Sequence, residues 1–316
     1  PHEKIKFWRN NKMINGIRIL DNPIDCSNEN LVYFDVTEIT RKDHKSGIQR
    51  VVRELYRNMI DLDTQVIPVR NTGDEWISAR AFDSSIKSNE YDDIEYRVKI
   101  DGQRMFLPDT CWDVKGLLDS IHDKAEISVV IYDLIPILQP VCTLEYLQKH
   151  FAEWMEKVIQ YANKCVCISR SVADDLIVYY KKNMPKRVQP LEVHYMHLGF
   201  DIPRLNEQVR TEISGFVNRG TTFLIVGTVE IRKNHHLLLR SFKRACLEFH
   251  DKQIQLLIIG KDGWKNEGFK ELYVNDEVIR ERCFWVKDAS DSEVQWAYQH
   301  CAALVYPPMA EGFGLP

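Results

Sequence analysis

The sequence predicts an α/β protein made of two doubly wound, Rossmann-like domains in tandem. Short apolar runs of the kind found in buried parallel strands alternate with amphipathic helices. A polar stretch at about 203–220 interrupts this alternation, which then restarts. The chain has 316 residues, enough for two domains that each bury a core. We expect an N-terminal extension at 1–30, a first domain at 31–202, a linker at 203–220 and a second domain at 221–316.

The first domain begins with a strand and a polar loop, followed by a helix whose apolar residues recur at helical spacing. Further along, Ser169 is expected to cap a helix at about 171–180. The stretch 71–103 is polar and weakly periodic, which indicates loops and small elements. The expected strands are 31–36, 65–69, 127–133, 164–168 and 192–196, and the other expected helices are about 48–59 and 146–162.

The second domain repeats the alternation of strand and helix. The expected strands are 222–227, 254–260, 284–286 and 302–306, and the expected helices are 237–249 and 291–300. In a parallel sheet all strands end at the same edge, and ligands bind in the crevice outside that edge. The loops that follow these strands are therefore the first place to look for a site.

Composition narrows the class of protein. The net charge of −4 argues against a nucleic-acid binder. No apolar run approaches the ~18 residues that a membrane span needs. The basic, aromatic start at 1–9 lacks a signal-peptide core and favours a disordered tail, with weak membrane-surface contact as the alternative. We expect a cytoplasmic protein, with peripheral contact at the inner face of the membrane left open.

The eight cysteines are scattered and form no C-x-x-C pair. Cys165 and Cys167 would point to the same face of a sheet, but no further ligands lie at a metal-binding spacing. Buried free thiols in a reducing compartment are the favoured interpretation. No Asp-x-Asp pair occurs in a suitable loop, so we predict no metal cofactor.

Two cations follow the first strand of the second domain. Gly227 ends the strand and lets a ligand approach the backbone closely. Arg232 and Lys233 come next, just before a helix whose N-terminal N–H groups favour anions. This arrangement suits a diphosphate, and a solvated basic turn is the alternative.

Two further strand ends should open on the same edge. The junction at 260–264 has two glycines and the cation Lys261. The last strand leads to Glu311, followed by Gly312, Phe313 and Gly314, a carboxylate and a flexible backbone that can meet a phosphate or a sugar. Three such junctions at one edge are stronger evidence of a site than any one alone.

The segments 231–235, 260–264 and 308–316 resemble, in order and spacing, the retaining GT-B-fold glycosyltransferases of family 4 (glycosyltransferase group 1). Within that family the chain is most similar to bacterial mannosyltransferases of surface-polysaccharide assembly. The first half matches more loosely, at 45–50, 130–136, 168–171 and 198–201. Ser46 and Gly47 fall in the block similar to the family's Gly-rich loop, on the acceptor side.

The resemblance implies roles for particular residues. Lys233, with Arg232, would bind the diphosphate of the donor, and Glu311 would be the first glutamate of an E-x7-E motif near the transferred sugar. The donor-binding set would be Gly227, Arg232, Lys233, Lys261, Val286, Asp288, Gly312, Phe313 and Gly314. By the same resemblance, Val286 and Asp288 would belong to the segment that lines the nucleobase in the family.

The sequence departs from the family pattern at three places. Tyr132 stands where many members have a His that contacts the donor sugar, although Asp133 remains, so the implied catalytic set is Glu311, Asp133 and Tyr132. Thr228 replaces a common basic residue, which leaves Arg232 and Lys233 to neutralise the phosphates. The second glutamate would lie beyond Pro316, which leads us to expect a second domain truncated at its C-terminus.

These patterns lead to one main hypothesis and two alternatives. The main hypothesis is a retaining hexosyltransferase that moves mannose from a nucleotide-diphosphate sugar such as GDP-mannose to a saccharide or lipid-linked saccharide acceptor. An inactive fragment or a nonenzymatic nucleotide-sugar-binding protein is the first alternative. The second is the same fold with a UDP- or dTDP-sugar donor. The sequence does not decide the oligomeric state.

Overall fold

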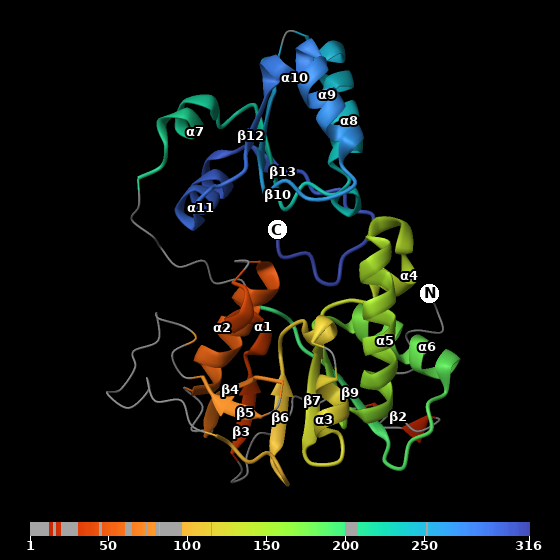
Figure 1. Ribbon diagram of the computed structural model, residues 1–316. Coiled ribbons are helices and arrows are strands. Elements are labelled where there is room, and N and C mark those ends of the chain that lie inside the picture. Colours follow the sequence, from red (N-terminus) through yellow and green to blue (C-terminus); the bar gives the residue numbers. More distant parts are fainter. Residues whose placement is uncertain are drawn as a thin grey trace. The chain divides into compact units, whose positions relative to one another are not determined.

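The computed structural model describes residues 13–14, 17–19, 31–43, 46–60, 65–73, 75–79, 82, 97–114, 116–199, 208–250 and 252–316. The chain divides into two compact units, each with an α/β architecture (Figure 1). Unit 1 comprises Pro1–Leu138 and Glu145–Leu198, and unit 2 comprises Gln139–Leu144 and Gly199–Pro316. Among the described residues, no helix is long and apolar enough to cross a membrane.

Unit 1 contains a nine-stranded sheet that is parallel except at its two edges. The strands, in their order across the sheet, are β1 (Met13–Ile14), β2 (Ile17–Ile19), β9 (Leu191–Tyr195), β8 (Lys164–Cys167), β7 (Glu126–Ile131), β6 (Arg104–Leu107), β3 (Val32–Asp35), β4 (Val66–Asn71) and β5 (Trp76–Ser78). The strands expected from periodicity are present. Strands β1 and β2 lie within the expected extension at 1–30 and lengthen the sheet at β9.

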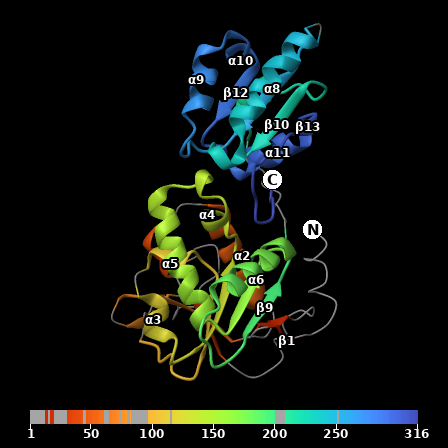
Figure 2. The ribbon, with the colours of Figure 1, turned by 90° about the vertical axis from the view of Figure 1, so that its right-hand side faces the viewer.

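Helices accompany the sheet of unit 1. They are α1 (Thr37–Arg41), α2 (Gly47–Ile60), α3 (Leu117–Ile121), α4 (Ile135–Leu138), α5 (Glu145–Tyr161) and α6 (Arg170–Asn183). Their apolar sides contribute to the core, and in α5 this side includes Phe151, Met155 and Val158. Ser169 caps α6 as predicted, since its Oγ accepts a hydrogen bond from the Val172 N–H at 3.3 Å. Figure 2 shows α5 and α6 beside the strands they cover.

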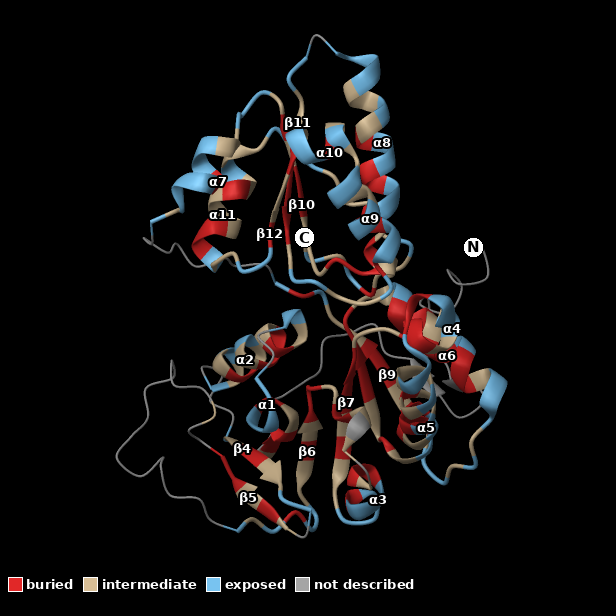
Figure 3. Cartoon of the chain, turned by 45° about the horizontal axis from the view of Figure 1, so that its top comes forward, coloured by how far each residue is buried: buried red, intermediate tan, exposed pale blue. Residues whose placement is uncertain are grey.

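Unit 2 contains a fully parallel sheet in the order β12 (Cys283–Val286), β11 (Gln255–Ile259), β10 (Thr222–Val226), β13 (Ala303–Leu304). The helices are α7 (Thr211–Phe216), α8 (His235–Glu248), α9 (Glu267–Asn275), α10 (Glu277–Arg282) and α11 (Asp291–His300). Most residues of strands β10 and β11 are buried, and the others are partly buried (Figure 3). The last strand is shorter than the expected 302–306.

The two faces of this sheet belong to separate cores. Ile225 and Ile258 pack with residues of α8 and α9, whereas Leu224 and Leu257 pack with residues of α7 and α11. A strand with both faces covered reads as a continuous apolar run, which is why β10 and β11 were visible in the sequence. Residues 208–220 of the expected linker contain α7, whose Ile213 is buried; 203–207 lie outside the described residues.

Among the described residues, short 3₁₀ helices occur at Cys111–Asp113, Pro140–Cys142 and Ile231–Lys233, and the last of these (η5) leads into α8. The seven cysteines within the described ranges are free thiols. Burial raises the pKa of Cys165 to about 12, so this thiol stays protonated. Cys165 and Cys167 both contribute to the core of unit 1.

Candidate functional site

The carboxyl ends of the strands of unit 2 lie at one edge of its sheet, because every strand pairing there is parallel. The hydrogen-bond ladder continues into the loops beyond. Gly227 N–H donates to the Ile259 carbonyl at 2.8 Å, and Val229 N–H donates to the Lys261 carbonyl at 2.8 Å. The predicted convergence of strand ends is therefore present in the backbone of unit 2.

Two glycines make this convergence possible. A Cβ added to Gly260 would lie 1.9 Å from the carbonyl oxygen of Gly227, so the two strand ends meet closer than any side chain allows. A Cβ at Gly263 would lie 2.8 Å from the Val229 carbonyl oxygen. The loops after β10 and β11 are thus laid directly on each other.

Arg232 and Lys233 lie in η5, and Asn234 then turns the chain into α8 with a φ of +60°. This left-handed conformation is one that Asn tolerates better than most residues. His235 follows, buried against the edge of the Phe269 ring. Burial, and secondarily the Lys233 charge, lower the pKa of His235 to about 4. The imidazole is therefore neutral at physiological pH, and the positive charge at the start of α8 comes from Arg232 and Lys233.

Glu311 binds both of these cations. Lys233 Nζ lies 2.6 Å from Glu311 Oε1, and Arg232 Nη1 lies 2.9 Å from Glu311 Oε2. The Tyr306 hydroxyl donates to Glu311 Oε1 at 2.8 Å and also contacts the Lys233 ammonium. Three of the residues that sequence analysis chose for donor binding and catalysis, Arg232, Lys233 and Glu311, are therefore in direct contact within unit 2.

Burial and neighbouring charges both shift the pKa values of Glu311, Lys233 and Tyr306. Burial works to raise the pKa of Glu311, but the charges of Arg232 and Lys233 outweigh it and hold that pKa below its ordinary value. Burial lowers the pKa of Lys233 and the Arg232 charge lowers it further, while Glu311 acts in the opposite direction. Burial, then the Glu311 charge, raise the pKa of Tyr306, so its hydroxyl remains a donor.

A second carboxylate completes this group. Arg232 Nη2 donates to Oε1 of the buried Glu230 at 2.8 Å. We call Glu230, Arg232, Lys233 and Glu311 the charge cluster. Sequence analysis missed Glu230 and Tyr306. The sequence could have indicated them only by their positions. Glu230 precedes Arg232 by two residues, and Tyr306 follows the last strand.

The remaining predicted donor-binding residues lie near the same edge, in different settings. Val286 is buried, and its carbonyl accepts a hydrogen bond from Gly260 N–H at 2.9 Å. Lys261 contributes its carbonyl to the loop ladder. Asp288 is bound by Arg210, whose Nη1 lies 3.0 Å from Asp288 Oδ1.

The segment after β13 is joined to the cations through its backbone. The Ala310 carbonyl accepts a hydrogen bond from Arg232 Nη1 at 3.1 Å, and Met309 N–H donates to the Arg232 carbonyl at 2.8 Å. These bonds hold the segment beside η5. The predicted glycine-rich backbone follows directly, with Gly312 buried, the Phe313 side chain exposed and Gly314 in a left-handed conformation (φ +89°).

The predicted residues of unit 1 have structural partners. The Tyr132 hydroxyl donates to the Pro108 carbonyl at 2.7 Å, and Asp133 Oδ1 accepts from Ile135 N–H at 3.0 Å, at the start of α4. Ser46 Oγ accepts from Gln49 N–H at 3.2 Å, so Ser46 and Gly47 form the start of α2. Asp133 therefore makes the turn contact that is common for an acid at a strand end.

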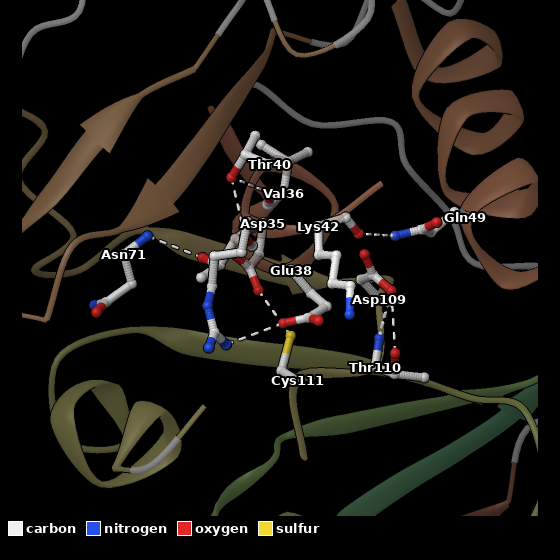
Figure 4. A network of polar contacts seen from close by, with 12 residues as sticks. Asp35, Val36, Glu38, Thr40, Lys42, Gln49, Asn71, Asp109, Thr110 and Cys111 are labelled. Atoms are coloured by element: carbon white, nitrogen blue, oxygen red, sulfur yellow. Dashed lines mark hydrogen bonds and ion pairs between the residues drawn. The ribbon is translucent and has the colours of Figure 1, made fainter. Parts of the chain in front are cut away.

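Unit 1 also contains a buried polar network that sequence analysis did not find (Figure 4). Asp35, at the end of β3, is fully buried; its Oδ1 accepts from Thr37 N–H at 3.0 Å, and its Oδ2 accepts from the Cys111 thiol at 3.0 Å. Asp109, after β6, accepts from Thr110 N–H at 2.7 Å. Burial raises the pKa of Asp35 to about 6, although the hydrogen bonds from Cys111 and Thr37 act against it.

Within the described part of the chain, no group of three or more His, Cys, Asp or Glu side chains could hold a metal ion. Several acidic and histidine side chains form ion pairs, cap helices or are buried in a hydrophobic core. His194 and His235, for example, are both buried.

Residues 208–316 match the family described as Glycosyl transferases group 1. This part of the chain is therefore similar to glycosyltransferase group 1 domains. Among curated proteins, the chain is 27% identical over 305 residues to the serotype-specific mannosyltransferase WbdA of Escherichia coli. The match covers 89% of this chain but 36% of that relative, so the chain spans about a third of the length of the curated relatives it matches.

Solved structures agree on the fold. Anabaena HepE in complex with UDP-glucose aligns with a TM-score of 0.54 and 13% identity, covering 90% of this chain and 76% of that one. Sucrose-phosphate synthase from Thermosynechococcus elongatus aligns with a TM-score of 0.57 and 12% identity, covering 91% of this chain and 77% of that one. At these identities the likeness concerns the fold alone, which is the GT-B fold that the resemblance implied.

Proposed function

We propose that the chain is a retaining glycosyltransferase that moves a hexose from a nucleotide-diphosphate sugar to a saccharide acceptor in surface-polysaccharide synthesis. Mannose, carried by GDP, is the first donor to test, because WbdA is a mannosyltransferase. A UDP-sugar is the second, because HepE forms complexes with UDP and UDP-glucose. We propose that the reaction needs no metal.

One observation carries this proposal. Arg232 and Lys233 converge on a single carboxylate, Glu311, at the start of α8. Both oxygens of that carboxylate are engaged, as the oxygens of a bound diphosphate would be. The N-terminal N–H groups of a helix add to the preference for an anion at this place. A group 1 domain with two such cations is suited to hold the diphosphate of a sugar donor.

The chemistry that follows is mainly electrostatic. When the bond between sugar and diphosphate breaks, negative charge develops on the leaving phosphate, and preorganised cations stabilise it more than water does. Arg232 can engage two phosphate oxygens with its planar fork, whereas Lys233 acts as a point charge. Attack of the acceptor hydroxyl from the face that the diphosphate leaves would retain the configuration of the sugar.

The first experiment is thermal unfolding with GDP-, UDP- and dTDP-sugars. A ligand that binds only the folded protein stabilises it by about 2.7 kcal/mol at a concentration 100 times its Kd. Stabilisation by GDP-mannose alone would support the mannosyl donor, and stabilisation by UDP-sugars alone would support the second donor. If no sugar nucleotide raises the unfolding temperature, the donor-binding proposal is wrong.

The second experiment separates an enzyme from a nonenzymatic binding protein. The Lys233→Ala variant should lose most sugar transfer to a saccharide acceptor, because one of the two cations at the diphosphate is gone. Arg244→Ala is the control; it removes one positive charge from an exposed position on α8, the helix that follows η5, and should transfer normally. Near-normal turnover by Lys233→Ala would rule out the diphosphate role. Donor binding without turnover in the wild type would favour the nonenzymatic alternative.

A further inference from the structure

The further inference concerns Glu230, which lies between β10 and η5. Its side chain is 2% exposed. A carboxylate in such a position is costly unless it is paired, because burial disfavours its charged form. Burial raises the pKa of Glu230, and the charges of Arg232 and Lys233 oppose this rise. Oε1 is paired with Arg232, and Oε2 is buried without a hydrogen-bond partner in the part of the chain that the structure describes.

Arg232 is held from two sides by carboxylates. Its Nη2 binds Glu230 Oε1 at 2.8 Å, and its Nη1 binds Glu311 Oε2 at 2.9 Å. The guanidinium group is planar and rigid, so fixing one amino nitrogen also fixes the direction in which the other points. Glu230 therefore helps to set where Nη1 is presented, together with the Ala310 carbonyl, which accepts a hydrogen bond from Nη1 at 3.1 Å.

Glu230 and Glu311 differ in how readily a bound anion could displace them from Arg232. The side chain of Glu311 is 18% exposed, and it comes from the segment that follows β13. The side chain of Glu230, at 2% exposed, is shielded from solvent. An incoming anion can therefore displace Glu311 from Arg232 Nη1 and Lys233 Nζ, while Glu230 stays bound to Nη2.

We propose that Glu230 is a positioning residue, which holds Arg232 by Nη2 so that Nη1 meets the diphosphate of the donor. This inference rests on the proposed function, since it needs an anion at the charge cluster. It makes a prediction opposite to that of simple electrostatics. Removing a negative charge beside an anion site should strengthen anion binding by Coulomb attraction, whereas removing a positioning residue should weaken it.

The test measures binding of inorganic pyrophosphate, GDP and UDP by isothermal titration calorimetry. Glu230→Gln keeps the shape and one acceptor oxygen, and we expect pyrophosphate to bind about tenfold more weakly, the scale of one charged hydrogen bond. Glu230→Leu removes the acceptor as well and should lose more. In an Arg232→Ala background, Glu230→Gln should cause no further loss, because the residue it positions is gone.

Glu293→Gln is the matched control. Glu293 is another buried carboxylate of unit 2 paired with an arginine, Arg210, at 2.6 Å. Its loss should leave pyrophosphate binding unchanged. If Glu230→Gln binds pyrophosphate as well as or better than the wild type, the positioning role is wrong while the proposed function stands. If the wild type binds none of the three ligands, the proposed function and this inference fail together. If Glu230→Leu does not fold, the comparison of Glu230→Gln in the wild type and in the Arg232→Ala background still tests the positioning role.

Discussion

Replacing Asp35 by Asn should remove a pH dependence from the stability of the protein. Asp35 is fully buried, and its pKa rises from 3.8 to about 6 in the folded state, chiefly through burial. A carboxyl group with a raised pKa is protonated more readily in the folded than in the unfolded chain. Its favourable contribution is therefore complete below pH 3.8 and is lost as the pH rises through 6. The amide of the Asp35→Asn variant would have no charge to titrate and would keep an oxygen for the Thr37 hydrogen bonds.

The size of the effect follows from the two pKa values. A shift from 3.8 to about 6 corresponds to about 3 kcal/mol between the fully protonated and fully ionised limits. Between pH 5 and pH 7.5, the wild type should lose about 1.4 kcal/mol of unfolding free energy relative to Asp35→Asn. The comparison uses only the change in unfolding free energy between the two pH values in each protein. It therefore does not depend on how much the substitution itself changes stability at a single pH.

The assay is urea unfolding of both proteins at several values of pH between 4.5 and 8. Asp119→Asn is the control, because it removes an exposed carboxylate of unit 1 that pairs with Lys157. That variant should follow the pH dependence of the wild type. Parallel stability curves for the wild type and Asp35→Asn would refute the argument, since Asp35 would then titrate alike in both states.

Three further predictions concern unit 2. Gly260→Ala should destabilise the fold by about 3 kcal/mol or more, because the new methyl group meets a backbone carbonyl; Gly215→Ala, in α7 with open space around it, should not. Thermal unfolding checks both variants. Ser290→Ala should cost about 1 kcal/mol by removing the capping box of α11, and chemical denaturation would show it; an unchanged midpoint would contradict it. Glu311→Gln should bind pyrophosphate about tenfold more tightly, a gain of about 1.4 kcal/mol, because the carboxylate that occupies both cations becomes neutral. Calorimetry that finds equal or weaker binding would argue against Glu311 as a competing anion.

Periodicity predicted the larger elements because their burial is regular. Strand β7 is an apolar run that is mostly buried, and helix α5 buries one apolar side. Both patterns can be recognised in the sequence. Strand β6 was not among the predicted strands, and strand β13 was predicted at 302–306 but has only two residues. Helix α7 was hidden because Ile213 is its only buried residue.

The candidate site was predictable in residue types but not in pairings. The sequence shows two cations and an acid at strand ends, and the parallel topology brings them together. It does not show that Glu311 binds both cations or that Glu230 holds Arg232. It also does not show that the Tyr132 hydroxyl is bonded to Pro108. These contacts depend on loop conformations that no local pattern encodes.

The close crossing of Gly227 and Gly260 has a consequence for the rate of backbone motion. The loops after β10 and β11 share hydrogen bonds beyond the strands, including that from Gly263 N–H to the Val229 carbonyl at 3.1 Å. Amide protons at Gly227, Val229 and Gly263 should therefore exchange with solvent as slowly as those of the sheet. The loops at the start of α8 would then already be ordered in the folded protein before a ligand binds. An anion that binds there meets an arranged surface and loses little affinity to ordering the loops.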